Sequence, residues 1–137
     1  MRIYLDSNVL ISLIKEEINS QLRALFIEAE RFFRNAKAKG HTLVISEFFL
    51  MEVGKICKIS RAQIIEYFEM MEVKTEIACL NEKIIREMAQ RIRLHYPGNF
   101  HAAIALANKC DCIVTFNGRD FEAIKCKIQV LEPLDLA

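Results

Sequence analysis

The sequence predicts a single α/β domain in which helices cover both faces of a small, mostly parallel sheet, giving a three-layer α/β/α sandwich. Three observations lead to this prediction. The strand-like stretches are short and almost wholly apolar, which is typical of parallel strands buried on both faces. Helical patterns alternate with them, as βαβ units require. The length of 137 residues suits one domain, so we expect a single unit over residues 1–137.

The first half of the chain contains two strand patterns, and each leads into helices. The predicted elements are a strand over residues 2–6, a helix over 9–14, a long amphipathic helix over 19–39, a strand over 42–45 and a helix over 47–58. Gly40 stops the three- and four-residue spacing of the long helix. Ser46 can accept hydrogen bonds from the first backbone amides of the helix that follows it, and therefore marks where that helix begins.

The second half of the chain continues the alternation. Its predicted elements are a helix over residues 61–71, a strand over 73–77, helices over 81–95 and 100–109, a strand over 112–116, a short helix over 120–124 and a strand over 128–131. Ser60 caps the first of these helices, and Asn81 opens the second. Pro97 and Gly98 separate the second helix from the third, because proline cannot continue a helix.

The composition argues against several classes of protein. The apolar runs are far too short to cross a bilayer and no secretory leader precedes the first strand, so we expect a cytoplasmic protein without membrane contact. The five cysteines are odd in number and scattered, and Cys110 and Cys112 lack the second pair or histidine of a structural zinc site. We interpret them as reduced thiols. The formal net charge of +1 gives no global field that would steer nucleic acid.

Three carboxylates are predicted to meet at one end of the sheet. Asp6 ends the first strand, Asp120 closely follows the strand over 112–116, and Glu52 lies on the helix after the second strand. In open parallel sheets the ligand crevice lies beyond the carboxyl ends of the strands. Converging carboxylates repel one another unless a cation offsets their charge, and their hard oxygens suit Mg²⁺ or Mn²⁺. Such an ion can activate water for phosphodiester hydrolysis, although each carboxylate taken alone also fits a helix cap or a solvated position.

Three segments resemble the motifs of the PIN-domain family of ribonucleases. The first motif is resembled by IYLDSNVLISLI, in which an aspartate ends the strand before a small hydroxyl residue and a short apolar helix. The second is similar to LVISEFFLMEVGKI, where the acidic position corresponds to Glu52 and not to Glu47. The third and most specific is similar to NFHAAIALANKCDCIVTFNGRDFEAI, an Ala-rich helix that leads to a strand and then to Thr, Asn and Asp-Phe. The resemblance covers nearly the whole chain.

This resemblance implies both a site and a function. Asp6, Glu52 and Asp120 match the family's metal-binding acids. The polar residues expected to support them are Ser7, Asn8, Thr115 and Asn117. The implied enzyme is a Mg²⁺- or Mn²⁺-dependent endoribonuclease that hydrolyses RNA, and the commonest small stand-alone example is a VapC-type toxin whose antitoxin inserts into the acidic groove. Such proteins usually form homodimers, and the apolar face of the helix over 19–39 would suit that interface or the antitoxin.

One position departs from the family pattern. PIN domains usually carry a further aspartate at the start of the Ala-rich helix, shortly before His101, where this chain has Pro97, Gly98 and Asn99. Asn99 offers a neutral oxygen there, so we take it as the fourth member of the site and expect weaker metal binding. His101 and Arg119 are further candidates, the first for assistance near the crevice and the second for a phosphate contact, although exposed surface positions explain both as well.

Two classes of function therefore stay open. The first is a metal-dependent ribonuclease. The second is a non-catalytic or weakened PIN domain that binds RNA or a protein partner, which binding without metal dependence would indicate. A flavodoxin-like nucleotide-binding or response-regulator domain is disfavoured, because no Gly-rich phosphate loop follows the first strand.

Overall fold

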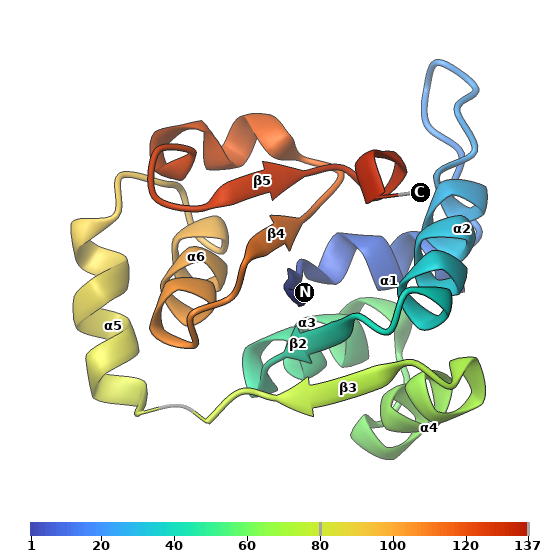
Figure 1. Ribbon diagram of the computed structural model, residues 1–137, viewed down its shortest axis with the longest axis horizontal. Coiled ribbons are helices and arrows are strands. Elements are labelled where there is room, and N and C mark those ends of the chain that lie inside the picture. Colours follow the sequence, from blue (N-terminus) through green and yellow to red (C-terminus); the bar gives the residue numbers. More distant parts are fainter. Residues whose placement is uncertain (80, 137) are drawn as a thin grey trace.

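The computed structural model, which describes residues 1–79 and 81–136, is built around a parallel five-stranded sheet (Figure 1). The strands are β1 (Arg2–Leu5), β2 (Thr42–Ile45), β3 (Lys74–Ile77), β4 (Cys112–Val114) and β5 (Gln129–Leu131). They lie in the order β3-β2-β1-β4-β5, and every neighbouring pair is parallel. The chain adds strands on one side of β1 and then on the other, so the strand order reverses between β1 and β4. The predicted α/β class is confirmed.

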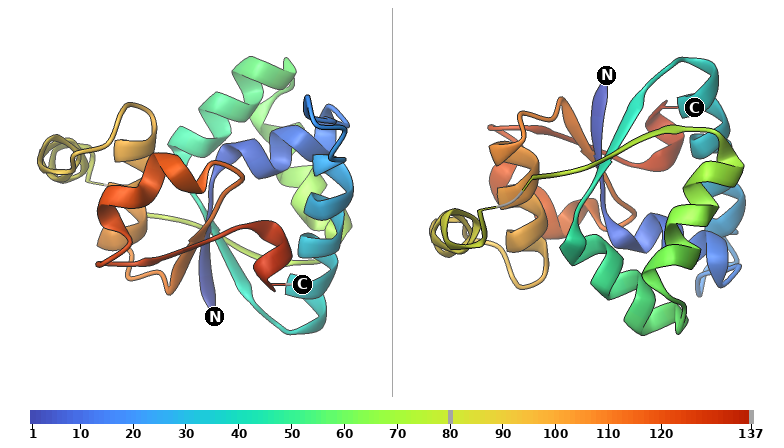
Figure 2. Two further views of the ribbon diagram at one scale, coloured as in Figure 1. Left: turned by 90° about the horizontal axis from the view of Figure 1, so that it is seen from above. Right: turned by 90° about the horizontal axis from the view of Figure 1, so that it is seen from below.

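Helices cover both faces of this sheet. They are α1 (Ser7–Ile14), α2 (Leu25–Ala38), α3 (Glu47–Cys57), α4 (Arg61–Met71), α5 (Glu82–Arg91) and α6 (Gly98–Ala107), with short 3₁₀ helices η1 (Gly118–Ile124) and η2 (Pro133–Leu136). Figure 2 shows α5 and α6 on one side of the sheet and α1 and α2 on the other. In the described part of the chain, no helix combines the length and apolar character needed to cross a membrane.

The sheet separates two hydrophobic cores. Ile3 and Leu5 of β1 face the core to which α1, α2, α3 and α4 contribute, whereas Tyr4 faces the core formed with α5, α6 and η1. All three side chains are fully buried, as the alternation along a strand covered on both faces requires. The predicted three-layer arrangement is therefore confirmed. Tyr4 carries a hydroxyl group deep into the layer that contains α6.

The prediction of a helix over residues 19–39 is wrong in its first part. The helix α2 begins at Leu25, and residues 15–24 form a loop that projects beyond its end (Figure 1). The side-chain oxygen of Asn19 accepts hydrogen bonds from the backbone amides two and four residues later. An asparagine that binds nearby backbone amides competes with the helix for them, which explains why the chain turns here.

The predicted helix over residues 81–95 is too long at its other end. The helix α5 stops at Arg91, and the next residue, Ile92, already has an extended backbone with φ −88° and ψ 123°. The next helix, α6, begins at Gly98, earlier than the predicted start at residue 100. The other predicted strands and helices are present with small shifts at their ends.

The apolar face of α2 is packed inside the chain. Phe32 and Phe33 are 1% and 3% exposed and belong to the same core as Phe68 of α4. These two rings are covered within the chain and are not the surface of an interface, whereas Ile27 of the same helix is 42% exposed. The homodimer itself stays a prediction.

Replacing Phe32 with alanine is expected to lower the free energy of unfolding by about 3–5 kcal/mol, because it removes a buried ring from a packed core. Phe26→Ala, at a half-buried position of the same helix, should cost clearly less. Urea denaturation of the two variants, followed by circular dichroism, measures the difference. Equal losses in the two variants would contradict the inward orientation of Phe32.

Candidate metal centre

The carboxyl end of β1 lies where the strand order reverses. The backbone amide of Asp6, the residue that follows β1, donates to the carbonyl oxygen of Val114 in β4 at 3.0 Å. Asp6 therefore lies next to the end of β4. This is the position at which open parallel sheets bind ligands. A cleft opens here, and its lining includes Asp6, Asn8, His101, Asn117 and Asp120.

Three side chains from different elements converge at this end of the sheet, and two of them, Asp6 and His101, line the cleft. One potential ligand atom from each of Asp6, Glu52 and His101 lies within 4.8 Å of the others. The Nε2 atom of His101 is 2.5 Å from Oε1 of Glu52 and 3.5 Å from Oδ1 of Asp6. The three residues come from the end of β1, the middle of α3 and the first turn of α6. No other such cluster of histidine, cysteine or acidic side chains occurs among residues 1–79 and 81–136.

Asp6 is unusually buried for a carboxylate, with 8% of its surface exposed. Burial raises the pKa of Asp6, and the neighbouring His101 and a hydrogen bond from Thr115 offset only part of this effect. The fold therefore disfavours the ionised carboxylate unless a cation accompanies it.

A hydrogen-bond network fixes the orientation of Asp6. The hydroxyl of Thr115 donates to Oδ2 of Asp6 at 2.7 Å. The same hydroxyl oxygen accepts hydrogen bonds from the side-chain amide of Asn8 at 3.1 Å and from the backbone amide of Asn117 at 3.0 Å. Three of the residues predicted to support the site are thus brought together beside Asp6, with Asn117 contributing through its backbone.

Glu52 is held from two sides. The hydroxyl of Ser7, a further predicted supporting residue, donates to Oε1 of Glu52 at 2.9 Å, and His101 contacts the same oxygen. Glu47, at the exposed start of α3, instead pairs with Arg61 at 2.7 Å. Glu52 and not Glu47 is therefore the acidic residue of α3 that lies close to Asp6.

The structure places His101, and not Asn99, beside the two carboxylates. The side-chain oxygen of Asn99 accepts a hydrogen bond from the backbone amide of Phe100 at 3.0 Å, and Asn99 does not line the cleft. Two residues advance a helix by about 200°, so positions 99 and 101 point to nearly opposite sides. The metal-binding role of Asn99 stays a prediction, and the residue that the structure places in the cluster is His101. Its exposed fraction of 1% also overturns the expectation of a surface histidine.

Tyr4 is a neighbour of the site that sequence reasoning missed. Its hydroxyl oxygen lies 2.7 Å from Nδ1 of His101. A signal was present in the sequence, because a tyrosine in a strand covered on both faces needs a hydrogen-bond partner for its hydroxyl. The pattern alone did not indicate which residue that partner would be.

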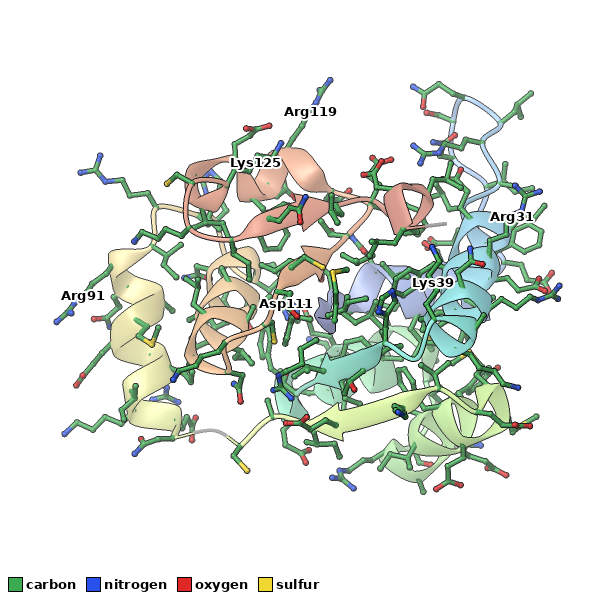
Figure 3. All side chains as sticks on the ribbon, viewed as in Figure 1. Arg31, Lys39, Arg91, Asp111, Arg119 and Lys125 are labelled. Carbon is green, nitrogen blue, oxygen red and sulfur yellow. The ribbon has the colours of Figure 1, made fainter. Side chains whose placement is uncertain are left out.

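Asp120 and Arg119 lie on η1 in different surroundings. Asp120 lines the cleft but stands outside the cluster of Asp6, Glu52 and His101. Arg119 is exposed and lines a neighbouring groove, and Figure 3 shows its side chain projecting away from the body of the protein. The metal-binding role of Asp120 and the phosphate contact of Arg119 stay predictions.

The donor atoms of the cluster suit a divalent cation. Carboxylate oxygens are ligands for Mg²⁺ and Mn²⁺, and an imidazole nitrogen is a ligand for transition metals. The buried Asp6 carboxylate also lacks a full compensating charge from the protein. The residues present therefore fit a bound divalent metal ion.

Comparison with known proteins gives a match to one family. The sequence model of the PIN domain matches residues 3–126. The matched range includes Asp6, Glu52 and His101 as well as Asp120. A comparison with curated proteins finds no match.

Proposed function

We propose that this chain, which belongs to the PIN-domain family of nucleases, is a metal-dependent endoribonuclease. One observation carries the proposal: Asp6, Glu52 and His101 bring potential ligand atoms within 4.8 Å of one another at the carboxyl end of β1. All three residues lie within the range that the family model matches.

The proposed reaction is hydrolysis of an RNA phosphodiester. A divalent cation, Mg²⁺ or Mn²⁺, held by Asp6, Glu52 and His101 would polarise a phosphoryl oxygen and lower the pKa of water. Other side chains of the protein keep these ligands oriented. Thr115 does so for Asp6, and Ser7 does so for Glu52, each through a hydroxyl that donates to the carboxylate.

We extend the proposal to a biological role as the toxin of a VapBC-type toxin–antitoxin pair. Its support is the resemblance of the three sequence motifs. In this role the protein acts in the cytoplasm as a homodimer, and its antitoxin is a protein that enters the cleft. The cysteines are free thiols, which agrees with a reducing compartment. Sedimentation of the purified chain tests the dimer.

A second candidate function is a weakened or non-catalytic PIN domain that binds RNA or a protein. The observation that favours it is the composition of the cluster, in which two carboxylates are joined by an imidazole. A histidine ligand contributes no negative charge, so the centre holds a divalent cation less strongly than a cluster of acids would.

Cleavage of single-stranded RNA by the purified chain separates the two candidates. The nuclease proposal expects cleavage in Mn²⁺ or Mg²⁺, its loss on addition of EDTA, and its recovery when metal is restored in excess. Gel analysis of a labelled RNA measures all three. RNA binding without cleavage at any concentration of either metal would favour the second candidate.

A further inference from the structure

His101 is held between a buried hydroxyl and two carboxylates. Its Nε2 atom faces Asp6 and Glu52, and its Nδ1 atom lies 2.7 Å from the hydroxyl oxygen of Tyr4. We propose that His101 is a nitrogen ligand supported in the required tautomer by Tyr4, and that it makes the centre prefer a divalent transition metal, such as Mn²⁺, over Mg²⁺. The inference rests on the proposed function, since it concerns the ion that the nuclease would use.

Tyr4 can support either tautomer of His101. A metal needs the lone pair of Nε2, so the ring proton must then lie on Nδ1, from which it is donated to Tyr4. The Tyr4 hydroxyl can donate in turn to the hydroxyl oxygen of Ser46, 3.0 Å away. Without a metal, Nε2 donates to Glu52, and the two hydroxyls reverse their direction because each can donate or accept. Without a metal, both nitrogens of the imidazole have hydrogen-bond partners. With a metal, Nε2 binds the ion in place of Glu52, and Nδ1 keeps its hydrogen bond to Tyr4.

The surroundings of His101 hold its ring in one orientation. Tyr4 is fully buried at the centre of the sheet, and its hydroxyl lies within hydrogen-bond distance of both His101 and Ser46. The ring of Phe48 packs against the imidazole with their centroids 4.9 Å apart. A histidine fixed by packing and by a hydrogen bond on its far nitrogen is arranged in the manner of a metal ligand.

The choice of metal follows from the donor set. Mg²⁺ prefers an octahedron of oxygen ligands and loses its waters reluctantly. Mn²⁺ and the later divalent metals bind more strongly than Mg²⁺ to a site that includes an imidazole. An imidazole in place of a third carboxylate removes one negative charge and one hard oxygen from the centre. Both losses weaken the binding of Mg²⁺ more than the binding of Mn²⁺. A centre of two carboxylates and His101 should therefore show a larger ratio of Mn²⁺ affinity to Mg²⁺ affinity than a centre of three carboxylates would.

Calorimetric titration of the metal-free full chain with Mn²⁺ and with Mg²⁺ measures this preference. We expect His101→Asp to narrow the ratio of the two affinities by about tenfold, because it restores a charged oxygen ligand. We expect Tyr4→Phe to weaken Mn²⁺ binding by about tenfold, because partners of a ligating histidine contribute that much. Tyr67→Phe, on the outer helix α4, is the matched control and should change neither affinity. Circular dichroism checks that each variant folds.

Pulsed electron paramagnetic resonance of Mn²⁺ bound to the unaltered chain gives a second measurement. We expect coupling to an imidazole nitrogen, and its absence in His101→Asp. A spectrum without nitrogen coupling, or an affinity ratio that His101→Asp leaves unchanged, overturns the inference. Mn²⁺ bound through nitrogen in a protein that cleaves no RNA would instead overturn the proposed nuclease and leave the inference standing. RNA cleavage by a protein whose bound Mn²⁺ shows no nitrogen coupling would support the proposed nuclease and overturn the inference about His101.

Discussion

Asp6→Asn is expected to lower metal-dependent RNA cleavage by about a thousandfold, because the loss of a metal-holding carboxylate removes several kcal/mol of transition-state stabilisation. It is also expected to raise the melting temperature of the metal-free protein by a few degrees. Burial raises the pKa of Asp6, and His101 and Thr115 offset part of the rise. The protonated carboxyl of Asp6 therefore favours the folded state at low pH, and this contribution to the free energy of unfolding is lost as the pH rises through the folded-state pKa of Asp6. At neutral pH the ionised carboxylate destabilises the fold, and a neutral amide does not.

Melting curves with a chelator and cleavage rates in Mn²⁺ measure these two effects of Asp6→Asn. Asp111→Asn is a matched control. Asp111 is exposed, and its carboxylate accepts a hydrogen bond from the backbone amide of Arg2 at 2.7 Å, at the opposite end of β1. This control should leave cleavage unchanged. If Asp6→Asn kept most of the activity, or melted several degrees lower without metal, Asp6 would not be a metal ligand held at a cost to stability.

Much of the fold follows from local patterns in the sequence. The apolar, β-branched stretch over residues 42–45 forms β2 with the predicted bounds. Ser46 accepts a hydrogen bond from the backbone amide of Phe49, and Ser60 forms a capping box with Gln63, so both predicted helix starts are confirmed. These signals act over a few neighbouring residues, and a single sequence contains them in full.

The candidate site could be predicted only in part. Asp6 stands out because an ionisable group ends an apolar strand, and burial of such a group calls for a partner. The place of His101 depends on the residue at which α6 begins, since a shift of the helix start decides which side chains fall in its first turn. Its contact with Tyr4 joins residues 97 positions apart in the chain. Local patterns carry no information on such a pairing, because packing between layers determines it.

Glu52→Gln is expected to lower cleavage by about a thousandfold, because it removes the other carboxylate of the cluster. Glu47→Gln, on the same helix, should leave cleavage nearly unchanged. Glu47 is exposed and pairs with Arg61, and loss of a surface ion pair costs at most about 1 kcal/mol of stability. The two variants remove the same charge from the same helix, so they separate metal binding from a general electrostatic effect.

Cleavage rates and Mn²⁺ titrations of the two glutamine variants provide the measurement. In Glu52→Gln the side chain can still accept the hydrogen bond from Ser7 with its amide oxygen, so the fold around α3 should persist. The expected result is lost Mn²⁺ affinity together with lost cleavage, at a melting temperature close to that of the unaltered chain. Similar activity in Glu52→Gln and Glu47→Gln would mean that the carboxylate next to His101 does not hold the metal. Loss of cleavage with full Mn²⁺ affinity would give Glu52 a role other than metal binding, because the ion would then rest on the remaining ligands.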